Sequence, residues 1–555
     1  MTFKKTMNIS RLMVAAAAVA SLSLTGCEKL DPTVAAPLNK PVTPDTPDVP
    51  DTPTVSDIPE GAEERKVTLD LSKTYQTIAG FAASDCWNVA WVGKYWTGKR
   101  EELARYLFSQ DMVGGHPQGI GLSMWRVNLG GGSYEQGNNS GITTVTRRAE
   151  SYRRNGTTDG YDWTKCEGQR YFMEQAKAAG VESFVLFSNS PLVQYTYNGQ
   201  ARSDRGSVSN LKPEHYADFA GYLADVASHF RGEGYNITHI SPINEPQFKW
   251  DGTDQEGSGY STAEQVKLIR ALDAALTEKN VATDILPGEA TAWDVLYQNQ
   301  RIANNFYEPS NANYIGNLDH VKNNLVGAHS YWSDASWAGM RQVRSRVAQV
   351  AQNLGMEVWQ TEWSMLDSGY SSDEYSGFDN ASEMENALYM SRVIHNDLTV
   401  ANVSSWSYWT SMDVPHYGHK NRFVLIKLTP AGGEWGDITA GDGSYTVTPN
   451  LWVLGNYSRF VRPGYRRVDT THDENLDFFG SSYVSADGKT LVSVYTNKTD
   501  KTLYLTDEFE GRDAVKAMRT YTTTATKHLT PTNIATNGGH AILEPQSVTT
   551  VIYEL

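Results

Sequence analysis

Two glutamates are the residues of this sequence best suited to chemistry. Glu245 stands in an Asn-Glu-Pro triplet and Glu362 in a Thr-Glu-Trp triplet, and each triplet closes an apolar run. Two facing carboxyl groups in unlike surroundings can cleave a glycosidic bond, because one must stay protonated to release the leaving oxygen and the other must stay charged to attack the anomeric carbon. A buried structural pair is the alternative, although acids at strand ends are costly unless they are used.

The elements that must position these glutamates alternate along the chain. The predicted strands are Ile78–Ser84, Ser123–Asn128, Glu182–Ser190, Ile237–Glu245, Asp284–Thr291, Leu325–Tyr331, Glu357–Trp363 and Ser404–Thr410. The predicted helices are Lys99–Phe108, Arg170–Ala179, Pro213–His229, Ala263–Lys279, Met340–Leu354 and Ala381–Leu398. This alternation predicts an α/β fold, a (β/α)8 TIM barrel, whose functional side chains gather at the carboxyl ends of the strands. Glu245 and Glu362 end the fourth and seventh strands, on nearly opposite sides of the barrel.

An open doubly wound sheet is the alternative α/β architecture. Such a sheet usually carries a glycine-rich phosphate loop after its first strand. The segment Gly80–Ser84 lacks the G-x-G-x-x-G spacing, and the three glycines at 130–132 follow the second strand without forming a Walker motif. The sequence therefore favours the barrel.

The chain changes character after about residue 450, where short β runs replace the helical pattern. These runs are Leu491–Tyr495, Thr502–Leu505, Ala514–Arg519 and Val548–Tyr553. We predict an antiparallel β-sandwich over 450–555, completed by strand residues 63–77, in which apolar and polar residues alternate. The barrel would then span 78–449.

The N-terminal residues 1–27 are typical of an export signal. Basic residues precede the apolar run Leu12–Leu24, which is too short to anchor a protein across a bilayer. The run ends in Leu-Thr-Gly-Cys, which resembles a bacterial lipobox and would make Cys27 the lipidated N-terminus; an ordinary signal peptide is the alternative. Residues 28–62 are rich in proline and predict an extended linker. We expect an exported protein, lipid-anchored at the outer membrane or cell surface.

The composition limits the class of protein further. Hydrophobic residues make up 40% of the 555 residues, which excludes a disordered chain, and the net charge of −16 argues against a nucleic-acid partner. The 15 Trp and 30 Tyr suit either a large core or carbohydrate stacking. Apart from Cys27 only Cys86 and Cys166 occur, and their spacing leaves open whether they pair. No ligand spacing demands a metal, and we expect no cofactor.

Together the motifs resemble glycoside hydrolase family 30, a family of clan A. The resemblance rests on the two glutamate triplets, on Leu71–Ser84 at the first strand, on Ser188–Pro191 at the third, and on 450–464 at the link to the β domain. Leu192 departs from the pattern, because a second proline is common there. The resemblance covers about residues 65–555.

The resemblance implies a retaining hydrolase with Glu245 as general acid/base and Glu362 as nucleophile. Their carboxyl groups should then lie about 5–5.5 Å apart. Arg126, on the second strand, would lie beside Glu362 and keep it ionised, with a structural ion pair as the alternative. Asn244 would hydrogen-bond the sugar 2-hydroxyl, and Tyr331 would donate to Glu362.

Further candidate residues lie on the later strands and in the loops. His329 points the same way along the sixth strand, and a satisfied core histidine is its alternative. Trp409 would form the hydrophobic floor of the −1 sugar site. Trp87, Trp250 and Trp332, in loops above the catalytic face, would stack on sugars, with packing as the alternative. The same two interpretations apply to Trp91, Tyr195, Phe248 and Trp363.

The substrate is indicated by one segment. Asn244–Trp250 followed by Gln255–Gly257 resembles the branch of the family that contains endo-β-1,6-galactanases, and Ser84–Trp87 agrees with that branch. The implied partner is a polysaccharide, the side chains of arabinogalactan. A β-1,4-xylanase and a β-1,6-glucanase are alternatives, as is a non-catalytic glycan-binding lipoprotein on the same scaffold. We expect a monomer that meets a membrane only through its lipid anchor.

Overall fold

The computed structural model describes residues 58–155, 157, 159–366, 374–377, 380–415, 423–511, 515–534 and 539–555. The predicted export signal, Cys27 and most of the predicted linker lie outside these residues. Across the described ranges, no helix is long and apolar enough to cross a membrane.

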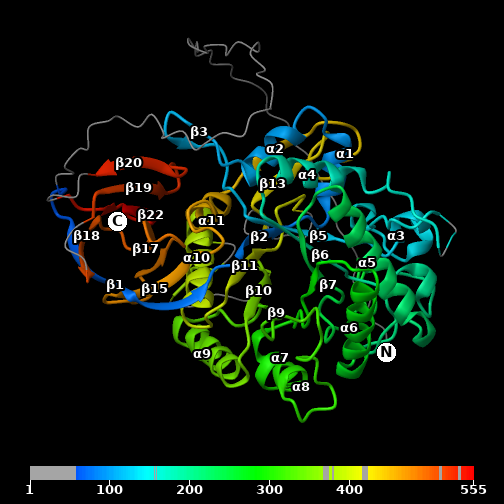
Figure 1. Cartoon of the computed structure of the whole chain (residues 1–555). Helices are drawn as coiled ribbons and strands as arrows, with labels where there is room; N and C mark the ends of the chain where they lie inside the picture. The colour runs from blue at the N-terminus through cyan, green and yellow to red at the C-terminus, as the bar shows by residue number, and fades with distance from the viewer. Residues whose placement is uncertain are drawn as a thin grey trace, which may run out of the picture. The chain divides into compact units, whose positions relative to one another are not determined.

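The centre of the molecule is a parallel sheet of eight strands (Figure 1). Its strands are β2 (Gly80–Ser84), β5 (Met124–Asn128), β6 (Ser183–Phe187), β7 (Ile237–Ser241), β8 (Asp284–Ile285), β9 (Val326–His329), β10 (Val358–Trp363) and β11 (Ser405–Tyr408). They are ordered β8-β7-β6-β5-β2-β11-β10-β9. An isolated parallel bridge between Ala290 and Ala328 closes the ring after β8. The predicted (β/α)8 barrel is therefore confirmed.

Helices connect the strands on the outside of this ring. Those that match predicted helices are α2 (Arg100–Phe108), α4 (Glu167–Ala178), α5 (Tyr216–Gly232), α6 (Thr262–Glu278), α9 (Trp337–Leu354) and α10 (Glu383–Thr399). Side-chain caps explain three of their starts: Ser261 and Glu264 form a capping box at α6, and Ser336 and Ser382 cap α9 and α10. The sequence pattern missed α1 (Asn88–Tyr95), α3 (Ser133–Gln136), α7 (Trp293–Tyr297), α8 (Ile302–Tyr307) and α11 (Pro449–Ser458).

The missed helix α11 corrects the predicted domain character after residue 450. All ten of its residues are buried. A helix that is buried on every side has no polar face, so it shows no amphipathic period in the sequence. The C-terminal strands of this domain therefore begin at Arg466, after the predicted domain boundary at residue 450.

The C-terminal domain is a nine-stranded sheet. It contains β1 (Glu63–Thr77), β15 (Arg466–Thr471), β16 (Phe478–Val484), β17 (Thr490–Asn497), β18 (Leu503–Glu510), β19 (Ala517–Thr523), β20 (Thr530–Ile534), β21 (Ile542–Leu543) and β22 (Ser547–Glu554), ordered β20-β19-β22-β17-β16-β15-β1-β18-β21. The N-terminal strand β1 thus lies between strands of the C-terminal chain, as predicted (Figure 1). It pairs antiparallel with β15 but parallel with β18, so the sheet is not wholly antiparallel.

This sheet curls so that strands far apart in its order face each other. Tyr553 on β22 donates its hydroxyl to Asp507 on β18 at 2.7 Å, and Asn497 on β17 donates to the carbonyl of Leu543 on β21 at 3.3 Å. The enclosed core includes Leu69, as well as Val67, Phe478, Leu505, Tyr495 and Val551. Two small sheets complete the molecule: β3 (Met112–Val113) with β4 (His116–Pro117), and β12 (Met412–Asp413) with β13 (Ile426–Thr429) and β14 (Ser444–Val447).

The interior of the barrel is filled below its carboxyl-terminal rim. Side chains from several strands meet there, among them Ala82, Met124, Val185, Leu286 and Trp359. The barrel is therefore a packed core with its functional groups at the rim, as this fold requires.

Candidate active site

Strands β7 and β10 bring the two candidate glutamates to the rim. Glu362 lies in β10, directly opposite His329 of β9 in the ladder register. Glu245 follows β7 by four residues and has a φ of 43°, in the left-handed region. Its amide donates to the carbonyl of Glu289 at 3.2 Å. The unusual backbone turns the Glu245 side chain toward the centre of the barrel.

The two carboxyl groups lie close together around one histidine. His329 Nδ1 is 3.0 Å from Glu245 Oε1 and 3.8 Å from Glu362 Oε1. One oxygen of each glutamate and one ring nitrogen of His329 lie within 4.8 Å of one another, which fits the short separation of a retaining pair and not the roughly 6.5–9.5 Å of an inverting pair. Both side chains are largely buried, at 12% and 7% exposed. The spacing suits direct attack by one carboxylate.

Arg126 of β5 holds three groups of the site at once. Its Nη1 donates to Glu362 Oε2 at 2.7 Å, and its Nη2 donates to Asn244 Oδ1 at 3.1 Å. Nη2 also lies 3.5 Å from Glu289 Oε2, and the guanidinium stacks on the ring of Phe187 at 3.7 Å. Arg126 thus fixes the position of Glu362, the candidate nucleophile, relative to Asn244, which precedes the candidate acid/base Glu245.

The charge state of Glu362 does not depend on Arg126 alone. Burial, the largest effect, raises the pKa of Glu362, and Glu245 raises it further. His329 and Arg126 lower that pKa but do not reverse the shift. Arg126 therefore acts on the pKa of Glu362 in the expected direction, and His329 acts together with it.

His329 is a charged residue close to three carboxyl groups rather than an isolated core histidine. Burial alone would lower the pKa of His329, but the carboxylates of Glu362, Glu245 and Glu289 raise it to about 10. Its Nδ1 donates to Glu245 and its Nε2 donates to Glu289 Oε2 at 3.0 Å. At neutral pH the ring is therefore an imidazolium that orients both acids.

Glu289 is the functional residue that the sequence analysis missed. It is fully buried and has a φ of 43°. Its Oε2 accepts hydrogen bonds from His329 and from the hydroxyl of Thr361 at 2.6 Å. Burial alone would raise the pKa of Glu289, but Arg126 and His329 outweigh it and lower this pKa to about 2. Its position inside the fifth predicted strand was the available signal, since the same strand-end rule selected the other two glutamates.

Tyr331 and Asn244 also reach the glutamates. The Tyr331 hydroxyl donates to Glu362 Oε1 at 3.1 Å, and burial raises the pKa of this tyrosine well above its ordinary value. The buried side chain of Asn244 borders the cleft beside Glu245. The predicted polar set is thus brought together at one place.

An aromatic cleft opens above the glutamates, with an empty volume of about 1010 Å³ that includes the open solvent at its mouth. The four tryptophans in the predicted set, Trp87, Trp250, Trp332 and Trp409, all line it. Trp87 meets Trp409 edge to face at 5.1 Å, and Trp332 is the most open of the four, with 54% of its surface exposed. Aromatic walls of this kind suit the apolar faces of sugars.

The remaining aromatic candidates differ in their surroundings. Phe248 lines the cleft, but Trp363 is buried against Tyr389 and Trp406, and Tyr195 stacks on His215. Trp91 lines a neighbouring pocket instead. Trp363 and Tyr195 therefore follow the packing interpretation.

The segment 255–257 builds the cleft wall in a way that the sequence did not reveal. Gln255 accepts a hydrogen bond from Arg147 at 2.9 Å, and Arg147 lies 4.2 Å above the ring of Trp87. Gly257 passes so close to Trp250 that a Cβ would lie 2.2 Å from the indole. A side chain at Gly257 would therefore displace Trp250 from the cleft.

Glu245, His329 and Glu362 also offer ligand types that metals use. Both ring nitrogens of His329 donate to carboxylates, however, so the imidazolium has no lone pair to offer a cation. The group therefore fits a hydrogen-bonded acid pair better than a metal centre. Cys86 and Cys166, whose pairing was open, are both free and buried.

A closed (β/α)8 barrel with two acids facing each other in an aromatic cleft defines a glycoside hydrolase. The model of O-glycosyl hydrolase family 30 matches residues 64–424. The chain belongs to this family, and it is an O-glycosyl hydrolase with the retaining chemistry of its clan.

Known proteins of several specificities are similar to this chain. An endo-beta-1,6-galactanase of Hypocrea rufa is 24% identical over 430 residues, which cover 74% of this chain and 77% of that protein. The glucuronoxylanase XynC of Bacillus subtilis (strain 168) is 22% identical over 387 residues, covering 68% and 76%. A crystal structure of a conserved exported protein from Bacteroides fragilis is 29% identical, with a TM-score of 0.80 over 88% of this chain and 99% of that one.

Proposed function

We propose that this chain is an endo-β-1,6-galactanase that cuts the side chains of arabinogalactan, with Glu362 as nucleophile and Glu245 as general acid/base. The observation that carries the assignment is the close approach of the two carboxyl groups, within 4.8 Å through one oxygen of each. An inverting pair would stand about 6.5–9.5 Å apart to admit a water molecule. The similarity to a galactanase supports the substrate.

The first step forms a covalent glycosyl ester. A Glu362 oxygen attacks the anomeric carbon, and Glu245 gives its proton to the departing glycosidic oxygen. Arg126 and Tyr331 keep their hydrogen bonds to Glu362, so the attacking carboxylate does not rotate. Asn244, held by Arg126, is the group proposed to bind the sugar 2-hydroxyl.

The second step releases the sugar with its configuration retained. Glu245 is now a carboxylate and takes a proton from water, whose oxygen attacks the anomeric carbon and frees Glu362. His329 donates to Glu245 and stabilises its charged form in this step. Both glutamates then return to their starting states.

Three polysaccharides test the substrate. Purified protein is incubated with arabinogalactan, pustulan and glucuronoxylan, and released reducing ends are measured. Release from arabinogalactan is expected, with a β-configured first product by NMR. Release only from pustulan or glucuronoxylan would instead identify the chain as a β-1,6-glucanase or a β-1,4-xylanase, and an α-configured first product would contradict retention.

Paired variants test the residues. Glu362→Gln should abolish release while binding persists, and Glu245→Gln should abolish release from unactivated substrates. Glu357→Gln is the matched control, because Glu357 lies next to the opposite end of the same strand, where its Oε1 accepts hydrogen bonds from Trp359 and Ser404. Equal release by Glu362→Gln and wild type would overturn the nucleophile assignment.

We also propose how the enzyme is organised in the cell. Residues 1–27 would be removed and Cys27 lipidated, with 28–62 as a linker to the barrel of 78–449 and the β domain of 63–77 and 450–555. The enzyme would act as an exported monomer at the outer membrane or cell surface. Labelling with radioactive palmitate should mark the wild type and not Cys27→Ala; equal labelling of both would refute the anchor.

A further inference from the structure

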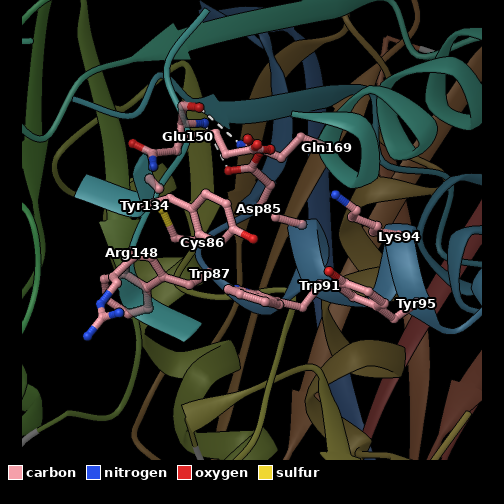
Figure 2. Close-up of a pocket in the computed structure, with 13 residues that line it drawn as sticks. Asp85, Cys86, Trp87, Trp91, Lys94, Tyr95, Tyr134, Arg148, Glu150 and Gln169 are labelled. Atoms are coloured by element: carbon pink, nitrogen blue, oxygen red, sulfur yellow. Dashed lines mark hydrogen bonds between the residues drawn. The ribbon is translucent and has the colours of Figure 1, made fainter. Parts of the chain in front are cut away.

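A second cavity lies beside the catalytic cleft. Its empty volume is about 510 Å³ with the open solvent at its mouth included, and it lies where β2 and β5 end, between α1 and α4 (Figure 2). Trp87 lines both this cavity and the catalytic cleft, so the two spaces adjoin across one indole. A group bound here would therefore lie next to the sugar that is being cleaved.

Aromatic rings form one side of this cavity. Trp91 and Tyr95 stack with their centroids 6.1 Å apart, and Tyr134 meets Trp91 edge to face at 5.8 Å. The indole nitrogen of Trp91 donates to the carbonyl of Thr146 at 3.1 Å, which fixes the ring. Figure 2 shows Tyr134, Trp91 and Tyr95 among the residues that line the cavity. Fixed rings of this kind offer large contact area at little cost in conformational entropy.

The opposite side is a buried polar floor. Asp85 Oδ1 accepts from the amide of Asn128 at 2.9 Å, and Oδ2 accepts from Gln169 at 2.7 Å. Gln169 also donates to the carbonyl of Asn128 at 3.0 Å, so the floor is held rigidly. A carboxyl group has about four lone-pair directions, and these contacts use two of them, which leaves acceptors for the hydroxyl groups of a ligand.

The charges around the cavity favour an uncharged ligand. Asp85 and Glu150 are both acids in its lining. The two basic lining residues already have partners: Lys94 lies 3.8 Å from Glu167, and Arg148 donates to the carbonyl of Ile142 at 2.8 Å. A ligand carboxylate would meet two acids without a dedicated cation, whereas hydroxyl groups would meet acceptors and phenol groups.

We propose that this cavity, the Trp91 pocket, binds one uncharged sugar residue of the polysaccharide while the adjoining cleft holds the bond to be cleaved. The proposal deepens the proposed function and rests on it. The sugar has two sources, a branch carried by the main chain or a residue of the main chain itself. With either source, the pocket would determine which oligosaccharides bind well. It would do so through residues other than the catalytic ones.

Two variants test the pocket without touching the catalytic groups. Tyr134→Phe removes only a hydroxyl group, and Ala90→Phe fills the cavity from α1, since Ala90 lines it. Tyr235→Phe is the matched control, because Tyr235 packs against Phe184 and Phe230 away from this pocket. We measure kcat/KM on 4-nitrophenyl β-galactoside, on linear β-1,6-galactotetraose and on the same tetraose carrying an arabinosyl branch.

On an oligosaccharide that fills the pocket, Ala90→Phe should lose about tenfold or more in kcat/KM and Tyr134→Phe about fivefold, mainly through KM. On the single-residue galactoside both should equal wild type, and Tyr235→Phe should equal wild type throughout. A loss confined to the branched tetraose identifies a branch, and a loss on both tetraoses identifies the main chain. Unchanged kinetics on both tetraoses, or an equal loss on the galactoside, would overturn the proposal that this pocket binds a sugar residue of the substrate.

Failure of the galactan assignment is separable from failure of the pocket. If wild type cuts pustulan or glucuronoxylan instead, the same variants are compared on oligosaccharides of that polymer, where unchanged kinetics again overturns the pocket. A preference for uronic-acid-bearing oligosaccharides that Lys94→Ala abolishes would contradict an uncharged ligand.

Discussion

Asp85 and Glu289 are two buried acids near the ends of barrel strands, and they differ sharply in charge. Glu289 contacts Arg126 and His329, and its pKa falls to about 2. Asp85 accepts hydrogen bonds from the backbone amide of Asn128 and the side-chain amide of Gln169, and burial raises its pKa to about 7. Burial alone does not decide whether an acid in this barrel is charged, because the neighbouring cations do.

The two regions of the barrel rim therefore suit different roles. Around Glu289 the charges are paired and fixed, which suits a site where charge must move during the reaction. Around Asp85 the hydrogen-bond partners are uncharged amide groups and aromatic rings line the same cavity, which suits recognition of hydroxyl groups. The two regions meet at Trp87, which lines both cavities.

Among the variants that test this comparison, Glu289→Gln should have the largest effect on stability and activity. The amide removes one of the buried carboxylates that Arg126 and His329 contact, and loss of one partner of a buried ion pair costs about 3–5 kcal/mol of stability. We expect a clear fall in Tm and a loss of about 100-fold in kcat, since about 3 kcal/mol corresponds to that factor. The pKa of His329 should fall, which moves the alkaline limb of the pH–rate profile to lower pH. A variant with wild-type Tm and kcat would refute the role of this acid.

Tyr331→Phe should have the next largest effect. The phenol hydrogen bond to Glu362 is charge-assisted, and such bonds contribute about 1.5–3 kcal/mol. We expect kcat/KM to fall about tenfold to 100-fold while Tm changes little. Steady-state kinetics on arabinogalactan oligosaccharides measure this, with Tyr235→Phe as the control; equal values for both variants would contradict the contact's importance.

Asp85→Asn should have a small effect that depends on pH. A raised pKa means that the folded protein binds the proton more tightly, so the stability from Asp85 is complete below pH 4 and is lost as pH rises toward 7. The variant lacks this proton, so its Tm should fall less steeply than that of wild type between pH 5 and 8. An asparagine side chain has one acceptor oxygen, so one of the two hydrogen bonds that Asp85 accepts is lost. This loss costs about 1 kcal/mol at every pH. Parallel Tm curves would show that Asp85 is already ionised across this range.

Chelation should have no effect on rate. Both nitrogens of His329 donate to carboxylates, so the group with Glu245 and Glu362 needs no ion. Activity after dialysis against EDTA should match that of untreated enzyme. A loss that calcium or zinc restores would show that a metal supports the site.

The sequence was sufficient for the barrel, for the two glutamates and for the insertion of β1 into the C-terminal sheet. It could not supply the parallel pairing of β1 with β18, because alternation of apolar residues does not encode strand direction. Helix α11 was missed because burial on every side removes its period. Glu289 was missed because no motif marks it, although it lies inside the fifth predicted strand, Asp284–Thr291.

Contacts within the site were harder still to foresee. That His329 would join three carboxylates depends on the ladder register between β9 and β10 and on the left-handed backbone at Glu245 and Glu289. Neither feature leaves a mark in residue type alone. The same limit explains why Trp91 was grouped with the cleft aromatics, although it lines the neighbouring pocket.

The most direct test of the central claim is the mass of a trapped intermediate. Wild-type enzyme is incubated with a 2-deoxy-2-fluoro β-galactoside that carries an activated leaving group, and the protein is digested and sequenced by mass spectrometry. We predict one fluorosugar attached through an ester to Glu362, and none in Glu362→Gln. A label on another residue, or turnover without any covalent adduct, would contradict the double displacement between Glu245 and Glu362.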